Sequence, residues 1–137
     1  MEKIVLISCV SKKLNKKSKA QDIYVSPLFK YNLRYAHSLS PDRIFILSAK
    51  YGLLKLGDII EPYDKTLNKM SNAERQEWAQ KVIKKLKKNV DLEKDKIIFL
   101  AGNNYRKFLI EHIKNYNVPM KGLSIGKQLK FLKEKLK

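Results

Sequence analysis

Short apolar runs alternate with longer amphipathic stretches along this chain. Three runs, residues 3–7, 43–47 and 96–100, are rich in β-branched and aromatic side chains and lack polar alternation. Such runs are typical of parallel strands that helices cover on both faces. The pattern therefore predicts a strand at each run, and residues 118–123 form a weaker candidate for a fourth strand.

Helical periods separate and follow these runs. Ser26 and Pro27 supply an N-cap and a first-turn proline for a helix over residues 27–39. Ser71 and Glu74 have the spacing of a capping box, which begins a second helix. Two more helices are expected, one after Asn103-Asn104 and one over residues 126–137. The expected buried stripes are Leu28, Tyr31, Tyr35 and Leu39 in the first helix and Trp78, Ala79, Val82, Ile83 and Leu86 in the second.

Alternation of strands and helices predicts an α/β fold. We expect residues 1–137 to form a single domain with a mainly parallel sheet of about four strands flanked by helices. The one long irregular stretch is residues 48–69, and loops of that length in a compact domain are usually functional or disordered.

The charge of the chain adds a candidate partner. Lys and Arg number 30 against 13 Asp and Glu, which gives a net charge of +17. A field of this size favours a polyanion, and we expect tRNA or DNA as the partner. A lysine-rich surface also arises from an AT-rich genome or from adaptation to heat, so both explanations stay open here.

Several classes of protein are disfavoured by the sequence. No signal peptide and no apolar run of membrane-spanning length are present, so we expect a cytoplasmic protein without a membrane partner. The single cysteine cannot form an intramolecular disulfide, and no Cys/His cluster has zinc spacing. Neither a phosphate-loop nor a dinucleotide fingerprint occurs. We therefore expect no metal and no cofactor.

Polar side chains follow each predicted strand, and these are the candidates for chemistry. Singly, each group could be a helix cap or a turn. Because the carboxyl ends of parallel strands meet at one edge of a sheet, we expect them to line one pocket. The candidate binding residues are Ser8, Lys13, Tyr24, Ser48, Lys50, Tyr51, Gly52, Tyr63, Gly102, Asn103, Tyr105 and Arg106, and the candidate catalytic residues are Cys9, Lys12, Glu61 and Asp64.

Particular roles follow from the chemistry of these groups. Glu61 or Asp64 is the expected general base, because a carboxylate in a partly dry pocket has a raised pKa. Tyr51 or Tyr63 could stack on a base, and lysines would hold phosphates. Cys9 is either a nucleophile, activated by nearby lysines or by a helix N-terminus, or a small residue at the edge of the core.

Five motifs carry a resemblance to known proteins. They are Ser8-Cys9-x-x-Lys12-Lys13, Tyr24-x-Ser26-x-Leu28-Phe29, residues 47–53 (Leu-Ser-Ala-Lys-Tyr-Gly-Leu), Glu61-Pro62-Tyr63-Asp64 and Ala101-Gly102-x-x-Tyr105-Arg106. In this order they resemble a small family of uncharacterised prokaryotic and phage proteins. The chain is more distantly similar to the core domain of archaeosine synthase, through Cys9 and Lys12, and to the YaaA-type peroxide-stress proteins.

The resemblance to archaeosine synthase implies an enzyme that modifies a nucleobase in tRNA by adding a lysine amine to the nitrile of 7-cyano-7-deazaguanine. Ser8 and Lys13 stand where that family has prolines. The expected function is thus binding of a nucleobase or nucleotide and action on nucleic acid. The alternatives are a non-enzymatic DNA- or RNA-binding protein and a binding subunit that works with a partner modification enzyme.

Overall fold

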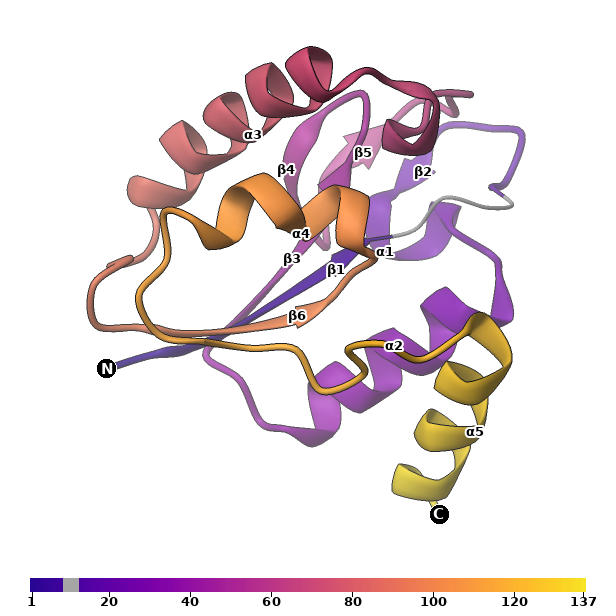
Figure 1. Cartoon of the computed structure of the whole chain (residues 1–137). Coiled ribbons are helices and arrows are strands. Elements are labelled where there is room, and N and C mark those ends of the chain that lie inside the picture. The colour runs from indigo at the N-terminus through magenta and orange to yellow at the C-terminus, as the bar shows by residue number, and fades with distance from the viewer. Residues whose placement is uncertain (9–12) are drawn as a thin grey trace.

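The computed structural model describes residues 1–8 and 13–137. Its centre is a five-stranded, mainly parallel sheet, most of whose strands are labelled in Figure 1. The strand order is β4-β3-β1-β6-β7, and only β4 runs antiparallel to its neighbour. These strands span Lys3–Ser8 (β1), Arg43–Ser48 (β3), Gly52–Lys55 (β4), Lys96–Leu100 (β6) and Tyr116–Asn117 (β7). The three predicted parallel strands are therefore confirmed and form the middle of the sheet.

Helices α3 (Asn72–Lys87) and α4 (Asn103–Ile110) cover one face of the sheet. Successive strand residues point to opposite faces, so Ile4 and Leu6 of β1 face these helices. The capping box of α3 forms as predicted: Glu74 N–H donates to Ser71 Oγ, and Ser71 N–H donates to Glu74 Oε1. The predicted buried stripe of this helix is confirmed at Trp78, Ala79, Val82, Ile83 and Leu86.

Helices α1 (Ala20–Ile23), α2 (Pro27–Ser38) and α5 (Ile125–Lys135) cover the opposite face, where Val5 and Ile7 point. The predicted stripe of α2 was shifted by one position. Its buried residues are Phe29, Asn32 and Ala36, whereas the expected residues Leu28, Tyr31, Tyr35 and Leu39 are only half-buried. The reason is that α5 packs beside α2, with the Tyr35 and Phe131 ring centroids 5.8 Å apart, and so covers part of a second stripe.

Residues 48–69 are not irregular, contrary to expectation. They contain β4, a short strand β5 (Ile59–Ile60) and a 3-10 helix η1 (Leu67–Lys69). Gly52 has φ +76°, a conformation that glycine adopts readily, and this turn lets the chain reverse so that Ser48 pairs with Gly52. Strand β5 pairs with β2 (Ser18–Lys19), which ties this segment to the chain that follows β1.

The weaker candidate strand, residues 118–123, was misplaced. The fifth strand of the sheet, β7, ends at Asn117, and the following residues turn. Pro119 has no backbone N–H for a ladder, and Gly122 has φ +81°, so neither suits a strand. No helix in the described ranges is long and apolar enough to cross a membrane.

Candidate functional site

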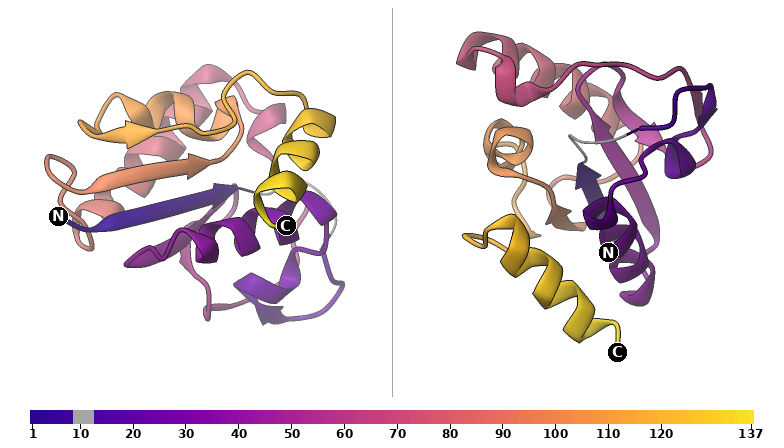
Figure 2. Two further views of the ribbon diagram at one scale, coloured as in Figure 1. Left: turned by 90° about the horizontal axis from the view of Figure 1, so that it is seen from below. Right: turned by 90° about the vertical axis from the view of Figure 1, so that its right-hand side faces the viewer.

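The carboxyl edge of the sheet contains a point where the chain leaves neighbouring strands in opposite directions. After β1 the chain passes to α1 and α2 on one face, whereas after β6 it enters α4 on the other face. Figure 2 (right) faces this edge, with α4, α5 and α2 around the ends of the strands. Ligands of open α/β sheets bind in the crevice that such divergence creates.

A cavity of about 490 Å³ occupies this position, and we call it the β1–β6 cavity. This volume lies within the range of roughly 300–1,000 Å³ that is typical of small-ligand sites. Its walls come from the end of β1, the first half of α2, η1, the β6–α4 junction and the start of α5. The described lining residues are Ser8, Ser26, Pro27, Leu28, Phe29, Asn32, Asn68, Leu100, Ala101, Gly102, Asn103, Asn104, Tyr105, Ile125, Gln128 and Leu129. None of them carries a charge.

Two sets of hydrogen-bonding groups in these walls lack the partners that such groups usually have. The N-cap of α4 is Gly102, which has no side chain, so the amides of Asn103 and Asn104 have no side-chain cap, whereas Tyr105 N–H donates to Gly102 O over 3.0 Å. Asn32 is only 3% exposed, and its Oδ1 accepts no hydrogen bond in the part of the chain that the structure describes. Gly102 N–H itself donates to Ser8 Oγ over 3.3 Å, which joins the ends of β1 and β6.

A second group of predicted residues forms a hydrogen-bond network beside the cavity, which we call the Tyr63 network. The Tyr24 and Tyr63 hydroxyls lie 2.7 Å apart, and Ser48 Oγ donates to the Tyr63 hydroxyl over 3.0 Å. Tyr51 N–H donates to Ser48 Oγ over 3.0 Å. Lys13 Nζ lies 4.4 Å from the centroid of the Tyr63 ring, at cation–π distance. The network links the segment after β1 to the segment after β3.

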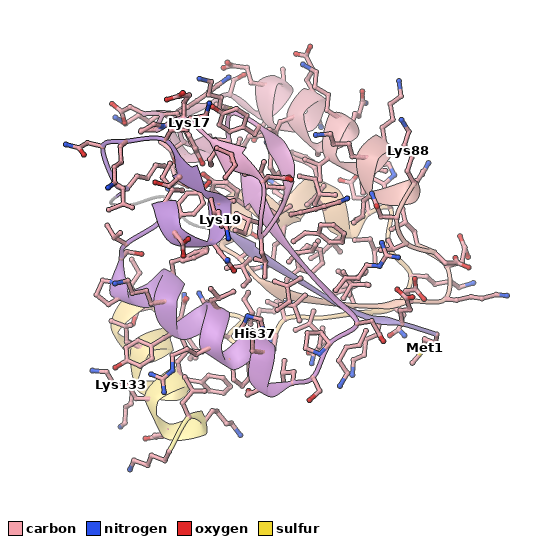
Figure 3. All side chains as sticks on the ribbon, turned by 180° about the vertical axis from the view of Figure 1, so that it is seen from behind. Met1, Lys17, Lys19, His37, Lys88 and Lys133 are labelled. Atoms are coloured by element: carbon pink, nitrogen blue, oxygen red, sulfur yellow. The ribbon has the colours of Figure 1, made fainter. Side chains whose placement is uncertain are left out.

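A second cavity, of about 410 Å³, lies between the β3–β4 turn and α3, and its lining from α3 runs from Glu74 to Lys85. We call it the lysine-lined cavity because four ammonium groups share its wall with only two carboxylates. The charged lining residues are Lys50, Lys65, Lys81, Lys85, Glu74 and Glu77. Positive charge is not confined to this cavity: Figure 3 labels Lys17 and Lys19 in the segment before α1, Lys88 at the end of α3 and Lys133 in α5.

The carboxylates expected to act as a base lie outside both cavities. Glu61 and Asp64 are exposed, and the Tyr51 hydroxyl contacts the backbone of Glu61 over 3.3 Å rather than its carboxylate. Arg106 folds back onto the strand end, where Nη1 donates to Ala101 O over 2.6 Å, and burial lowers the pKa of its guanidinium. The role of Glu61 or Asp64 as general base stays a prediction.

The predicted site residues therefore separate into neighbouring groups rather than line one pocket. Ser8, Gly102, Asn103 and Tyr105 lie in the wall of the β1–β6 cavity. The lysine-lined cavity contains Lys50, Tyr51 and Gly52. The Tyr63 network contains Lys13, Tyr24, Ser48 and Tyr63. Cys9 and Lys12 lie outside the described residues.

Asn32 was not among the predicted site residues, because it lies inside a helix and not at the end of a strand. The available signal was its spacing: Asn32 lies three residues after Phe29 and four before Ala36, on the apolar stripe of α2. No group of three or more His, Cys, Asp or Glu side chains within residues 1–8 and 13–137 could hold a metal ion.

Comparison with known proteins assigns the chain to a family but gives it no activity. No curated protein and no solved structure matches it significantly, so these comparisons give no link to archaeosine synthase or to the YaaA-type proteins. A family model does match, over residues 4–134. The chain belongs to DUF6884, a family of unknown function.

Proposed function

We propose that this protein binds a nucleobase of a nucleic acid at the carboxyl edge of its sheet and takes part in modifying it. The β1–β6 cavity is the observation that carries the proposal. Its position is where α/β sheets bind ligands, its volume suits a small molecule, and its described lining has no charged side chain. Such a wall favours an uncharged, largely apolar heterocycle over a free phosphate.

The charge outside the cavity supports a nucleic acid as the carrier of that base. The chain has a net charge of +17, and four lysines line the neighbouring cavity beside α3. Lysines hold phosphates as point charges and without base preference. A nucleic acid could place one base in the uncharged β1–β6 cavity and its phosphates near the lysines of the lysine-lined cavity.

A salt titration of tRNA and duplex DNA binding tests the proposal. Each phosphate neutralised on duplex DNA contributes about −0.9 to the slope of log affinity against log salt. The double variant Lys65→Ala/Lys81→Ala removes two exposed lysines from the lysine-lined cavity. We expect it to flatten the slope by about 2, because each lysine that contacts a phosphate accounts for about 1.

The matched control removes the same charge from the opposite edge. Lys87 and Lys94 are exposed and lie at the end of α3 and in the turn before β6, at the amino ends of the strands. Lys87→Ala/Lys94→Ala should leave the slope nearly unchanged. If both double variants flatten the slope equally, binding depends on net charge alone and not on the lysine-lined cavity. Absence of binding by the wild-type protein at about 50 mM salt would refute the proposal.

A further inference from the structure

We infer that the base held in the β1–β6 cavity is unpaired, and that Asn32 accepts a hydrogen bond from its base-pairing edge. This inference rests on the proposed function and deepens it by defining the substrate as single-stranded or locally opened nucleic acid. Two independent observations in the walls of one cavity carry it: a buried acceptor without a partner among residues 1–8 and 13–137, and a helix N-terminus without a side-chain cap.

The Asn32 side chain is placed where an apolar residue would be expected. Phe29 and Ala36, its neighbours on the buried stripe of α2, are 1% and 0% exposed, and Asn32 is 3% exposed. Buried side-chain oxygens nearly always accept a hydrogen bond, and one left without a donor lowers the stability of the fold. The Asn32 oxygen, unpartnered within the described residues, therefore lowers the stability of the ligand-free protein. A ligand that donates a hydrogen bond to this oxygen would explain why an asparagine occupies the position.

Helix α4 supplies the opposite kind of group in the same cavity. The amides of Asn103 and Asn104 are donors in its first turn, and N-cap Gly102 has no side chain to accept from them. Gly102, Asn103 and Asn104 all line the cavity. A ligand that bonds to both Asn32 Oδ1 and the amides of α4 must be an uncharged molecule that carries an N–H donor and a hydrogen-bond acceptor. Phosphate offers acceptors only, whereas the pairing edge of every common base offers both kinds of group.

The pairing edge is available only when the base has no partner strand. Proteins that read this edge bind single strands or turn the base out of the duplex, and stacking against apolar walls repays part of the cost. The half-buried side chains of Leu28 and Leu129 line the cavity and offer such walls. Asn32 Oδ1 is buried and accepts no hydrogen bond from the residues that the structure describes. Rotating the amide so that this oxygen faces a base therefore breaks no described hydrogen bond of the oxygen.

Asn32→Leu tests the inference with two readouts that should move in opposite directions. Leucine has nearly the shape of asparagine, favours helix and removes the unpartnered oxygen, so the melting temperature without ligand should rise by about 3 °C. Affinity for a single-stranded oligonucleotide should fall about tenfold, the value of one hydrogen bond. Binding to a duplex of the same sequence should not change.

Two variants in the same helix serve as controls. Ser26→Ala removes the N-cap hydroxyl that accepts from Phe29 N–H over 3.3 Å, so its melting temperature should fall. His37→Ala changes an exposed polar residue that does not line the cavity and should alter neither readout. A melting temperature that falls in Asn32→Leu would make Asn32 a structural residue and overturn the inference.

The nucleic-acid probes separate failure of this inference from failure of the proposed function. The wild-type protein should bind the single strand more tightly than the duplex. Equal affinity for both, unchanged in Asn32→Leu, would overturn the unpaired-base inference while leaving nucleic-acid binding intact. Binding of the four common ribonucleosides without binding of any oligonucleotide would make a free nucleoside the ligand, and no binding of any probe would refute the proposed function itself.

Discussion

Replacing Tyr63 with phenylalanine should destabilise the protein measurably, because its hydroxyl is the centre of the Tyr63 network. That hydroxyl lies 2.7 Å from the Tyr24 hydroxyl and 3.0 Å from Ser48 Oγ. Tyr24 is 1% exposed and Ser48 is fully buried, so water cannot replace the lost partner at either group. At about 1 kcal/mol for each buried hydroxyl left without that bond, Tyr63→Phe should cost about 2 kcal/mol.

Tyr51→Phe is the matched control, since it removes the same atom from a neighbouring ring. The Tyr51 hydroxyl contacts the exposed backbone of Glu61 over 3.3 Å, where water can take its place. Its loss should cost less than about 0.5 kcal/mol. The Tyr51 and Tyr63 rings, with centroids 5.7 Å apart, keep their edge-to-face packing in either variant.

Thermal melting and a double-mutant cycle provide the assay. In a chain of 137 residues, about 2 kcal/mol corresponds to a fall of roughly 7 °C in melting temperature. Combining Tyr63→Phe with Ser48→Ala should give a coupling free energy of about 0.5–3 kcal/mol, because the two hydroxyls share one bond. A shift for Tyr63→Phe no larger than that for Tyr51→Phe would refute the reasoning.

Three further substitutions test other parts of the fold. Asp95→Asn should cost about 1.5–3 kcal/mol at neutral pH, measured by urea unfolding, because its carboxylate accepts backbone hydrogen bonds that lower its pKa. Since the folded pKa is lowered, this stabilisation is present above about pH 4 and is lost as the pH falls through the lowered value, so a difference that persists in strong acid would contradict it. Gly52→Ala should cost about 1–2 kcal/mol because φ is +76°, and a neutral effect on the urea midpoint would exclude strain there. Ser71→Ala should cost about 1 kcal/mol through loss of the bond from Glu74 N–H, and an unchanged melting temperature would show that the cap contributes nothing.

The sequence was most informative where one physical rule determines the structure. Apolar runs without alternation identified β1, β3 and β6, and the Ser71–Glu74 spacing identified the start of α3. Ser8 at the end of β1 and Gly102 two residues after β6 lie at one edge of the sheet, because neighbouring parallel strands end at the same edge. These inferences needed only local periodicity and sheet geometry.

The sequence was least informative where packing against distant segments decides the outcome. The antiparallel strand β4 depends on a turn at Gly52 and on pairing with β3, which no local period signals. The burial of Asn32 depends on which face of α2 packs against the sheet, and α5, almost a hundred residues later in the chain, covers the neighbouring stripe of that helix. Division of the expected pocket into two cavities likewise follows from the positions of α3 and α5, which strand-end residues do not encode.

The two outer strands of the sheet determine how this protein can associate with other chains. One edge is β4, with four residues, and the other is β7, with two. Each offers an incoming strand only a few backbone hydrogen-bonding groups, which is how many proteins avoid edge-to-edge aggregation. Assembly by strand addition is accordingly disfavoured on both sides of this sheet, and we expect a protein partner to contact helix and loop side chains instead.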